Sequence, residues 1–69
     1  MNGARMVIQN RKAFKPTYWV GVVNENGKAL WGKTIYRQVS VPMLSKLAAS
    51  YRQKCAQLGL QLEEGWHKY

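Results

Sequence analysis

Few side chains in this chain could act as catalytic acids, bases or nucleophiles. The sequence holds one cysteine, Cys55, one histidine, His67, and three glutamates, but no aspartate. Glu63 and Glu64 are adjacent, so on a strand they would point to opposite faces. General acid–base work needs converging groups, and a lone cysteine with a lone histidine cannot complete a structural zinc site. We therefore predict that the protein is not an enzyme and holds no cofactor or metal; a nuclease relying on His67 is the minor alternative.

The net charge is the strongest feature of the composition. Eleven Lys and Arg side chains stand against three acids, giving a net charge of +8 at pH 7. A field of this sign attracts nucleic acid, anionic lipid or an acidic protein surface. The apolar runs are too short to cross a membrane. We expect nucleic acid as the partner, DNA before RNA, and no membrane.

Residues 1–16 are predicted to form a basic N-terminal arm. They carry Arg5, Arg11, Lys12 and Lys15 and no acid. The piece "MVI" could add a short strand, but the segment has little else to bury, so we expect it to order only on binding. Its cations would hold phosphates; the plain alternative is a solvated tail that keeps the chain soluble.

Residues 17–37 predict a β-hairpin. Two segments rich in aromatic and β-branched residues flank Asn26-Gly27, a pair that favours a type I′ turn. With this pair as the loop, one face carries Val22 opposite Trp31, Val20 opposite Lys33 and Tyr18 opposite Ile35. The other face carries Val23 opposite Leu30, Gly21 opposite Gly32 and Trp19 opposite Thr34. The first face is bulkier, so we assign it to the core. A four-residue loop over 24–27 would keep the same pairs, whereas a bulge would flip part of one strand.

An amphipathic helix is predicted over about 41–58. Ser40 suits an N-cap, Pro42 is tolerated in the first turn, and Gly59 suits a left-handed stop. An apolar stripe at helical spacing consists of Leu44, Leu47, Ala48, Tyr51, Cys55 and Leu58. Cys55 therefore belongs to a packed core. The tail that follows alternates enough for a short strand, and Trp66 and Tyr69 could fold back over the core.

These elements predict a small α+β domain over residues 17–69. Its antiparallel β-sheet is built on the central hairpin 17–37, has room for a flanking strand at each end, and packs on one helix. The hairpin-then-helix order from Tyr18 to Leu58, with Asn26-Gly27-Lys28 in the turn, resembles the small arm-type DNA-binding domains of some phage and transposon integrases. This resemblance in layout implies a DNA partner and a phage or mobile-element accessory protein.

The predicted binding surface combines cations with aromatic rings. Trp19 and Tyr36 would stand on the outer hairpin face beside the Gly21–Gly32 gap, where rings can stack on bases. The helix N-terminus has no acid in its first turn and would offer free amides to a phosphate. The full predicted set is Arg5, Arg11, Lys12, Lys15, Trp19, Lys28, Lys33, Tyr36, Arg37, Lys46, Arg52 and Lys54.

We therefore predict a small basic protein that binds nucleic acid, in the interior of a bacterial or virus-infected cell, as a single free cysteine suggests. One alternative is that the arm or the Trp66 segment covers the outer face, or that a homodimer seals it. The other alternative is a small phage-type inhibitor or adaptor that docks on an acidic surface of a host protein, for instance by adding a strand to its sheet.

Overall fold

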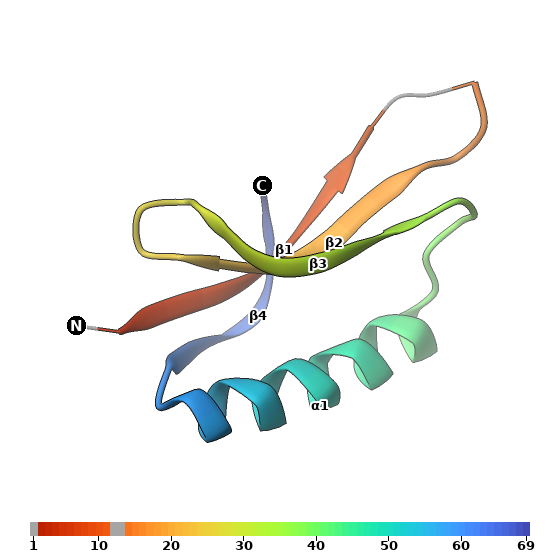
Figure 1. The fold of residues 1–69 in the computed structure, drawn as a ribbon. Helices are drawn as coiled ribbons and strands as arrows, with labels where there is room; N and C mark the ends of the chain where they lie inside the picture. Colours follow the sequence, from red (N-terminus) through yellow and green to blue (C-terminus); the bar gives the residue numbers. More distant parts are fainter. Residues whose placement is uncertain (1, 12–13) are drawn as a thin grey trace.

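Four strands and one helix make up the computed structural model, which describes residues 2–11 and 14–69 (Figure 1). The strands are β1 (Gly3–Asn10), β2 (Tyr18–Asn24), β3 (Ala29–Ile35) and β4 (Gln61–Lys68), and the helix is α1 (Val41–Leu58). The sheet order is β3-β2-β1-β4, and α1 covers one of its faces (Figure 1). The predicted α+β class, with a sheet packed on one helix, is confirmed.

The sheet is mixed, which differs from the antiparallel pairing that the hairpin alone suggests. β1 pairs with β2, and β2 with β3, in antiparallel fashion, whereas β1 pairs with β4 in parallel. β3 and β4 lie at opposite edges, so α1 carries the chain across the sheet between them. A parallel pair needs a long connection of this kind, and a helix supplies it.

Residues Gly3–Asn10 lie inside the sheet as β1 and not outside the fold as an arm. Ala4 and Met6 are buried against α1, and Val7, also buried, points to the opposite face. The segment thus has apolar side chains for both faces of the sheet. Its backbone groups form ladder hydrogen bonds with the two neighbouring strands, β2 and β4. Of the predicted basic arm, Arg11 and the described residues 14–16 lie outside the strands.

The hairpin turn differs from the predicted two-residue type I′ turn. The N–H of Gly27 donates to the carbonyl of Asn24 at 3.0 Å, and the N–H of Asn24 donates to the carbonyl of Lys28 at 2.9 Å. The Asn24 side chain accepts from the amides of Asn26 and Lys28, both at 2.9 Å, and Gly27 takes a φ of 80°. The loop is therefore longer than two residues, and the Asn24 side chain caps it from inside.

A bulge at the start of β3 cancels the extra loop residue. Val23 pairs with Ala29 instead of Leu30, and the register shifts between Val22 and Val23. Beyond the bulge every predicted hairpin pair is present, from Val22 with Trp31 to Tyr18 with Ile35. The predicted register is therefore confirmed except at Leu30.

The helix begins and ends at the predicted residues. Ser40 Oγ accepts from the amide of Met43 at 3.3 Å, and Gly59 closes the C-terminus in the left-handed conformation with a φ of 73°. Within the described residues, no helix is long and apolar enough to span a membrane.

The core lies between α1 and the sheet. Its buried members are Ala4, Met6, Val22, Ala48, Tyr51 and Cys55. Trp31 and Trp66 pack around them, and each ring meets Tyr51 edge-on, at centroid distances of 6.5 and 6.2 Å. Such pairs contribute about 0.5–1.5 kcal/mol beyond the area they bury. Val22 and Trp31 thus face the helix as predicted.

Burial in this core raises the pKa of the Cys55 thiol. Because only the unfolded chain then ionises near the ordinary thiol pKa, the free energy of unfolding should fall as the pH rises above about 8.5. The folded protein should react with a disulfide reagent at pH 8 far more slowly than the denatured protein, in a colorimetric thiol assay. Equal rates would show that Cys55 is accessible, contrary to its position.

Candidate nucleic-acid interface

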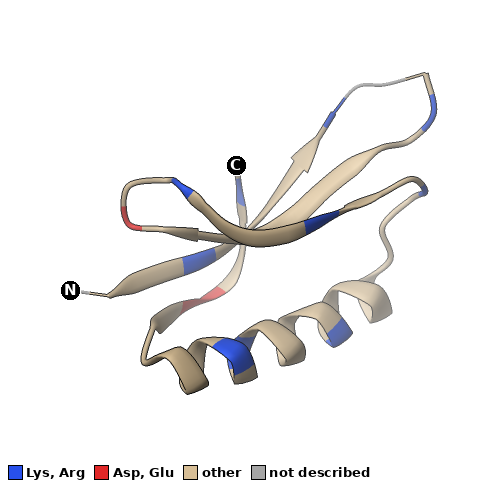
Figure 2. Ribbon diagram, viewed as in Figure 1, with Lys and Arg blue, Asp and Glu red and all other residues tan. Residues whose placement is uncertain are grey.

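The topology places all three glutamates toward one end of the sheet and a group of cations at the other. The strands β1, β3 and β4 run in the same direction and β2 runs against them. At the end where those three strands finish, called the basic end here, the described cations are Arg11, Lys15, Arg37 and Lys68. At the opposite end, called the acidic end, the hairpin turn and the first half of β4 carry the glutamates, and two cations accompany them (Figure 2); these residues are Glu25, Glu63, Glu64, Arg5 and Lys28.

Backbone and side-chain hydrogen bonds hold the connections at the basic end. The amide of Arg11 donates to the carbonyl of Thr17 at 2.9 Å, and Thr17 Oγ1 donates to the carbonyl of Lys15 at 3.0 Å. The Tyr18 hydroxyl lies 3.2 Å from Gln38 Oε1, to which it donates, tying the connection between β3 and α1 to the start of β2. The cations at this end are therefore carried on braced connections.

Tyr36 stands exposed at the basic end, with 75% of its surface accessible. A shallow depression of about 300 Å³ is lined by Lys33, Thr34, Ile35, Tyr36 and Arg37. Lys33 is exposed, although its pairing with Val20 places it on the helix side of the sheet. The structure thus brings together Lys33, Tyr36 and Arg37 from the predicted set.

Trp19 does not offer the open stacking surface that the sequence predicts. Its ring lies across the paired glycines: a Cβ built on Gly21 would come within 2.7 Å of the ring, and one on Gly32 within 2.8 Å. Neither distance is tolerated by a real Cβ. The missing side chains therefore make room for Trp19 and not for a ligand, and Trp19 is half-buried.

Tyr69 covers Trp19 on the outer face. The two ring centroids are 5.4 Å apart, and the Tyr69 hydroxyl donates to the carbonyl of Gly27 at 3.1 Å. Trp66, by contrast, packs on the helix side. Both residues thus fold back as expected, Tyr69 over the outer face and Trp66 on the helix side.

Replacing Tyr69 should expose Trp19. We expect Tyr69→Ala to lower the free energy of unfolding by about 1 kcal/mol through the lost ring pair, and Tyr69→Phe by about 0.5 kcal/mol through the lost hydrogen bond. Urea unfolding measures both, and the indole N–H signal of Trp19 in NMR spectra should shift in the alanine variant alone. If the alanine variant leaves that signal and the stability unchanged, Tyr69 does not cover Trp19.

The remaining predicted cations lie away from the basic end or act elsewhere. Arg5 lies near Glu25 and Glu63, with which it lines a hollow of about 220 Å³. The Lys54 ammonium lies 4.7 Å from the centroid of the Trp31 ring, a cation–π distance. Lys28 follows the hairpin turn, while Lys46 and Arg52 are exposed on the helix. Lys12 lies outside the described residues.

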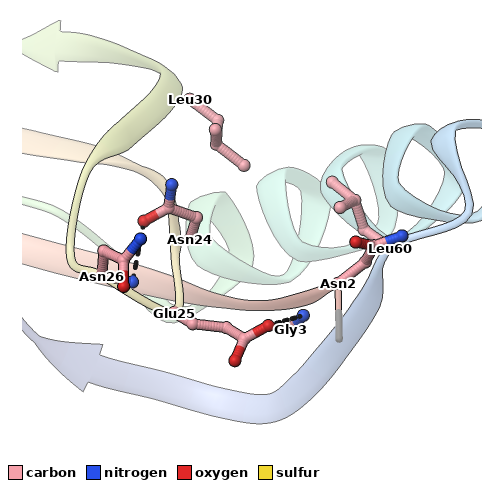
Figure 3. A pocket seen from close by; sticks show the side chains of 7 residues that line it. All are labelled: Asn2, Gly3, Asn24, Glu25, Asn26, Leu30 and Leu60. Carbon is pink, nitrogen blue, oxygen red and sulfur yellow. Dashed lines mark hydrogen bonds between the residues drawn. The ribbon is translucent and has the colours of Figure 1, made fainter.

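Another hollow lies at the acidic end, between the hairpin turn and the start of β1 (Figure 3). It measures about 390 Å³ and is lined by Asn2, Gly3, Asn24, Glu25, Asn26, Leu30 and Leu60. Glu25 Oε1 accepts from the amide of Gly3 at 3.1 Å, so this carboxylate fastens the turn to the start of β1.

A serine side chain, that of Ser40, caps the N-terminus of α1. Ser40 Oγ already accepts from the Met43 amide, so it is engaged in capping. The first turn holds no acid, which leaves its positive dipole uncompensated at the same end as Arg37. This partial charge adds to the field of the basic end.

His67 lies in β4 rather than in a loose tail, and its Nε2 is 3.5 Å from Glu63 Oε2. Among residues 2–11 and 14–69, no three His, Cys, Asp or Glu side chains lie close enough together to hold a metal ion.

Two residues at these surfaces were not foreseen. Phe14 is fully exposed, and Lys68 ends β4 at the basic end. The contact of Tyr69 with Trp19 agrees with the alternative in which the C-terminal segment covers the outer face. Phe14 precedes Lys15 just as Tyr36 precedes Arg37, a repeated aromatic–cation pair that the sequence alone could have revealed.

No family model, no curated protein and no solved structure matches this chain. The resemblance in layout to integrase DNA-binding domains therefore stays a prediction.

Proposed function

We propose that this protein binds nucleic acid, with DNA as the expected target, through its basic end. The observation that carries the proposal is a group of cations at one end of the sheet with no acid beside them. Arg11, Lys15, Arg37 and Lys68 lie at this end, whereas all the acids of the chain lie at the other end, where Arg5 and Lys28 accompany them. A polyanion would approach the basic end first, because no acid offsets the cations there.

The chemistry of the exposed groups supports a phosphate backbone as the ligand. Lysine and arginine contacts to phosphates supply most of the affinity of basic proteins for nucleic acid and release counterions from it. The exposed rings of Tyr36 and Phe14 would add contacts to bases. The buried free thiol of Cys55 fits the intracellular setting that is part of this proposal.

The test is a fluorescence-anisotropy titration of labelled duplex DNA, single-stranded DNA and RNA across a range of salt concentrations. About five phosphate contacts predict a slope of about −4.5 in log affinity against log salt for the duplex, and about −3.5 for a single strand. No binding to any of the three at 50 mM salt, a concentration that favours such contacts, would overturn the proposal.

A matched pair of double variants locates the site. Lys15→Gln with Arg37→Gln removes two exposed cations from the basic end, and Lys28→Gln with Arg52→Gln removes two exposed cations elsewhere. We expect the first pair to weaken binding about ten- to a hundredfold and to flatten the salt slope by about 1.5–2, because two phosphate contacts are lost. The second double variant should change the affinity and the salt slope much less. Equal effects of the two double variants would mean that net charge alone drives binding.

A second candidate function is docking on an acidic protein surface. The observation that favours it is the position of β3, an edge strand whose residues are mostly exposed. Lys28, Lys33 and Arg37 accompany this edge, to which an acidic extended segment could add as a further strand. A pull-down from nuclease-treated lysate separates the two functions: a single stoichiometric acidic protein favours docking, and the loss of all partners favours nucleic acid.

A further inference from the structure

We infer that the nucleic acid at the basic end is single-stranded, with a base stacked on Tyr36. This inference rests on the proposed function and names its substrate class. Its first ground is the position of the exposed aromatic rings, each of which is next to a cation. Its second ground is that no helix or strand pair among the described residues offers a basic surface that could enter the groove of a duplex.

Two large aromatic rings, those of Tyr36 and Phe14, are exposed at the basic end. Tyr36 has 75% of its surface accessible, and Phe14 is fully exposed at the turn of the β1–β2 connection. Both connections extend from the same end of the sheet (Figure 1). A base pair inside a duplex hides both faces of each base, whereas the bases of a single strand are free to stack on protein rings.

The surroundings of Tyr36 are the second observation. The depression that Tyr36 lines also holds Lys33 and Arg37, on either side of it in sequence, together with Thr34. A ring flanked by two cations matches the pattern of single-strand sites, in which the base stacks while the adjoining phosphates meet Lys or Arg. Thr34 supplies a hydroxyl that can donate to a phosphate or a base edge.

The hairpin and the helix are the two elements that could enter the groove of a duplex. A two-stranded ribbon would present the outer face of β2 and β3, but Trp19 fills the Gly21–Gly32 gap on that face and Tyr69 covers Trp19. The exposed side of α1 carries Ala49, Ser50, Gln53 and Gln57 between its cations. Neither surface concentrates cations as recognition elements of duplex DNA do.

The experiment compares an oligothymidine single strand with a blunt duplex of the same length, by anisotropy at one salt concentration. We expect the single strand to bind at least about tenfold more tightly. Tyr36→Leu should weaken single-strand binding about five- to a hundredfold, the range of one lost base stack, whereas Tyr36→Phe keeps the ring and should stay within about twofold of the unmodified protein. Circular dichroism of each variant checks the fold, which an exposed side chain should not affect.

The outcomes separate this inference from the proposed function. Binding to neither oligonucleotide overturns the proposed function itself. Equal or tighter duplex binding overturns the inference alone, and so does a leucine variant that binds the single strand as well as the phenylalanine variant does.

Discussion

The parallel pairing of β1 with β4 is the constraint on which the rest of the structure depends. It requires the chain to leave one edge of the sheet at Ile35 and to re-enter at the other edge at Gln61, and α1 makes that crossing. The crossing lays the apolar stripe of α1 over Met6 and Val22 and so creates the core. It also brings the ends of β1, β3 and β4 to one side of the molecule, so cations that are far apart in sequence lie at the same end of the sheet.

A small sheet with one helix leaves its second face open, and this chain closes that face with its own aromatic side chains. Trp19 lies over Gly21 and Gly32, and Tyr69 covers Trp19 and bonds back to the hairpin turn. Val7 and Val23 are fully buried even though the helix is on the other side. The apolar residues on both faces of the hairpin therefore serve two packing layers.

Patterns of short range predicted the fold well. The hairpin register, the caps at Ser40 and Gly59, and the burial of Cys55 follow from side-chain alternation, capping chemistry and helical spacing. The predicted type of turn was wrong, because the Asn24 side chain accepts hydrogen bonds from two amides of the loop and so favours a longer loop. A flanking strand at each end of the hairpin was anticipated, and both are present as β1 and β4. Their order and pairing depend on contacts across the whole chain, which no local pattern encodes. For the same reason the site was only partly predictable: Arg11, Lys15, Lys33, Tyr36 and Arg37 lie at or near the basic end, whereas Trp19 is covered by the last residue of the chain.

We propose that nucleic acid meets the basic end and leaves the acidic end free. Chemical-shift mapping of the isotopically labelled protein during titration with a short DNA strand is the sharpest test, because each amide reports its own surroundings. The largest shifts should fall on Arg11, Lys15, Tyr36 and Arg37, while the signals of Gly3, Glu25 and Leu60 around the acidic hollow should stay in place. Shifts centred on the acidic end, or spread evenly over both ends, would contradict it.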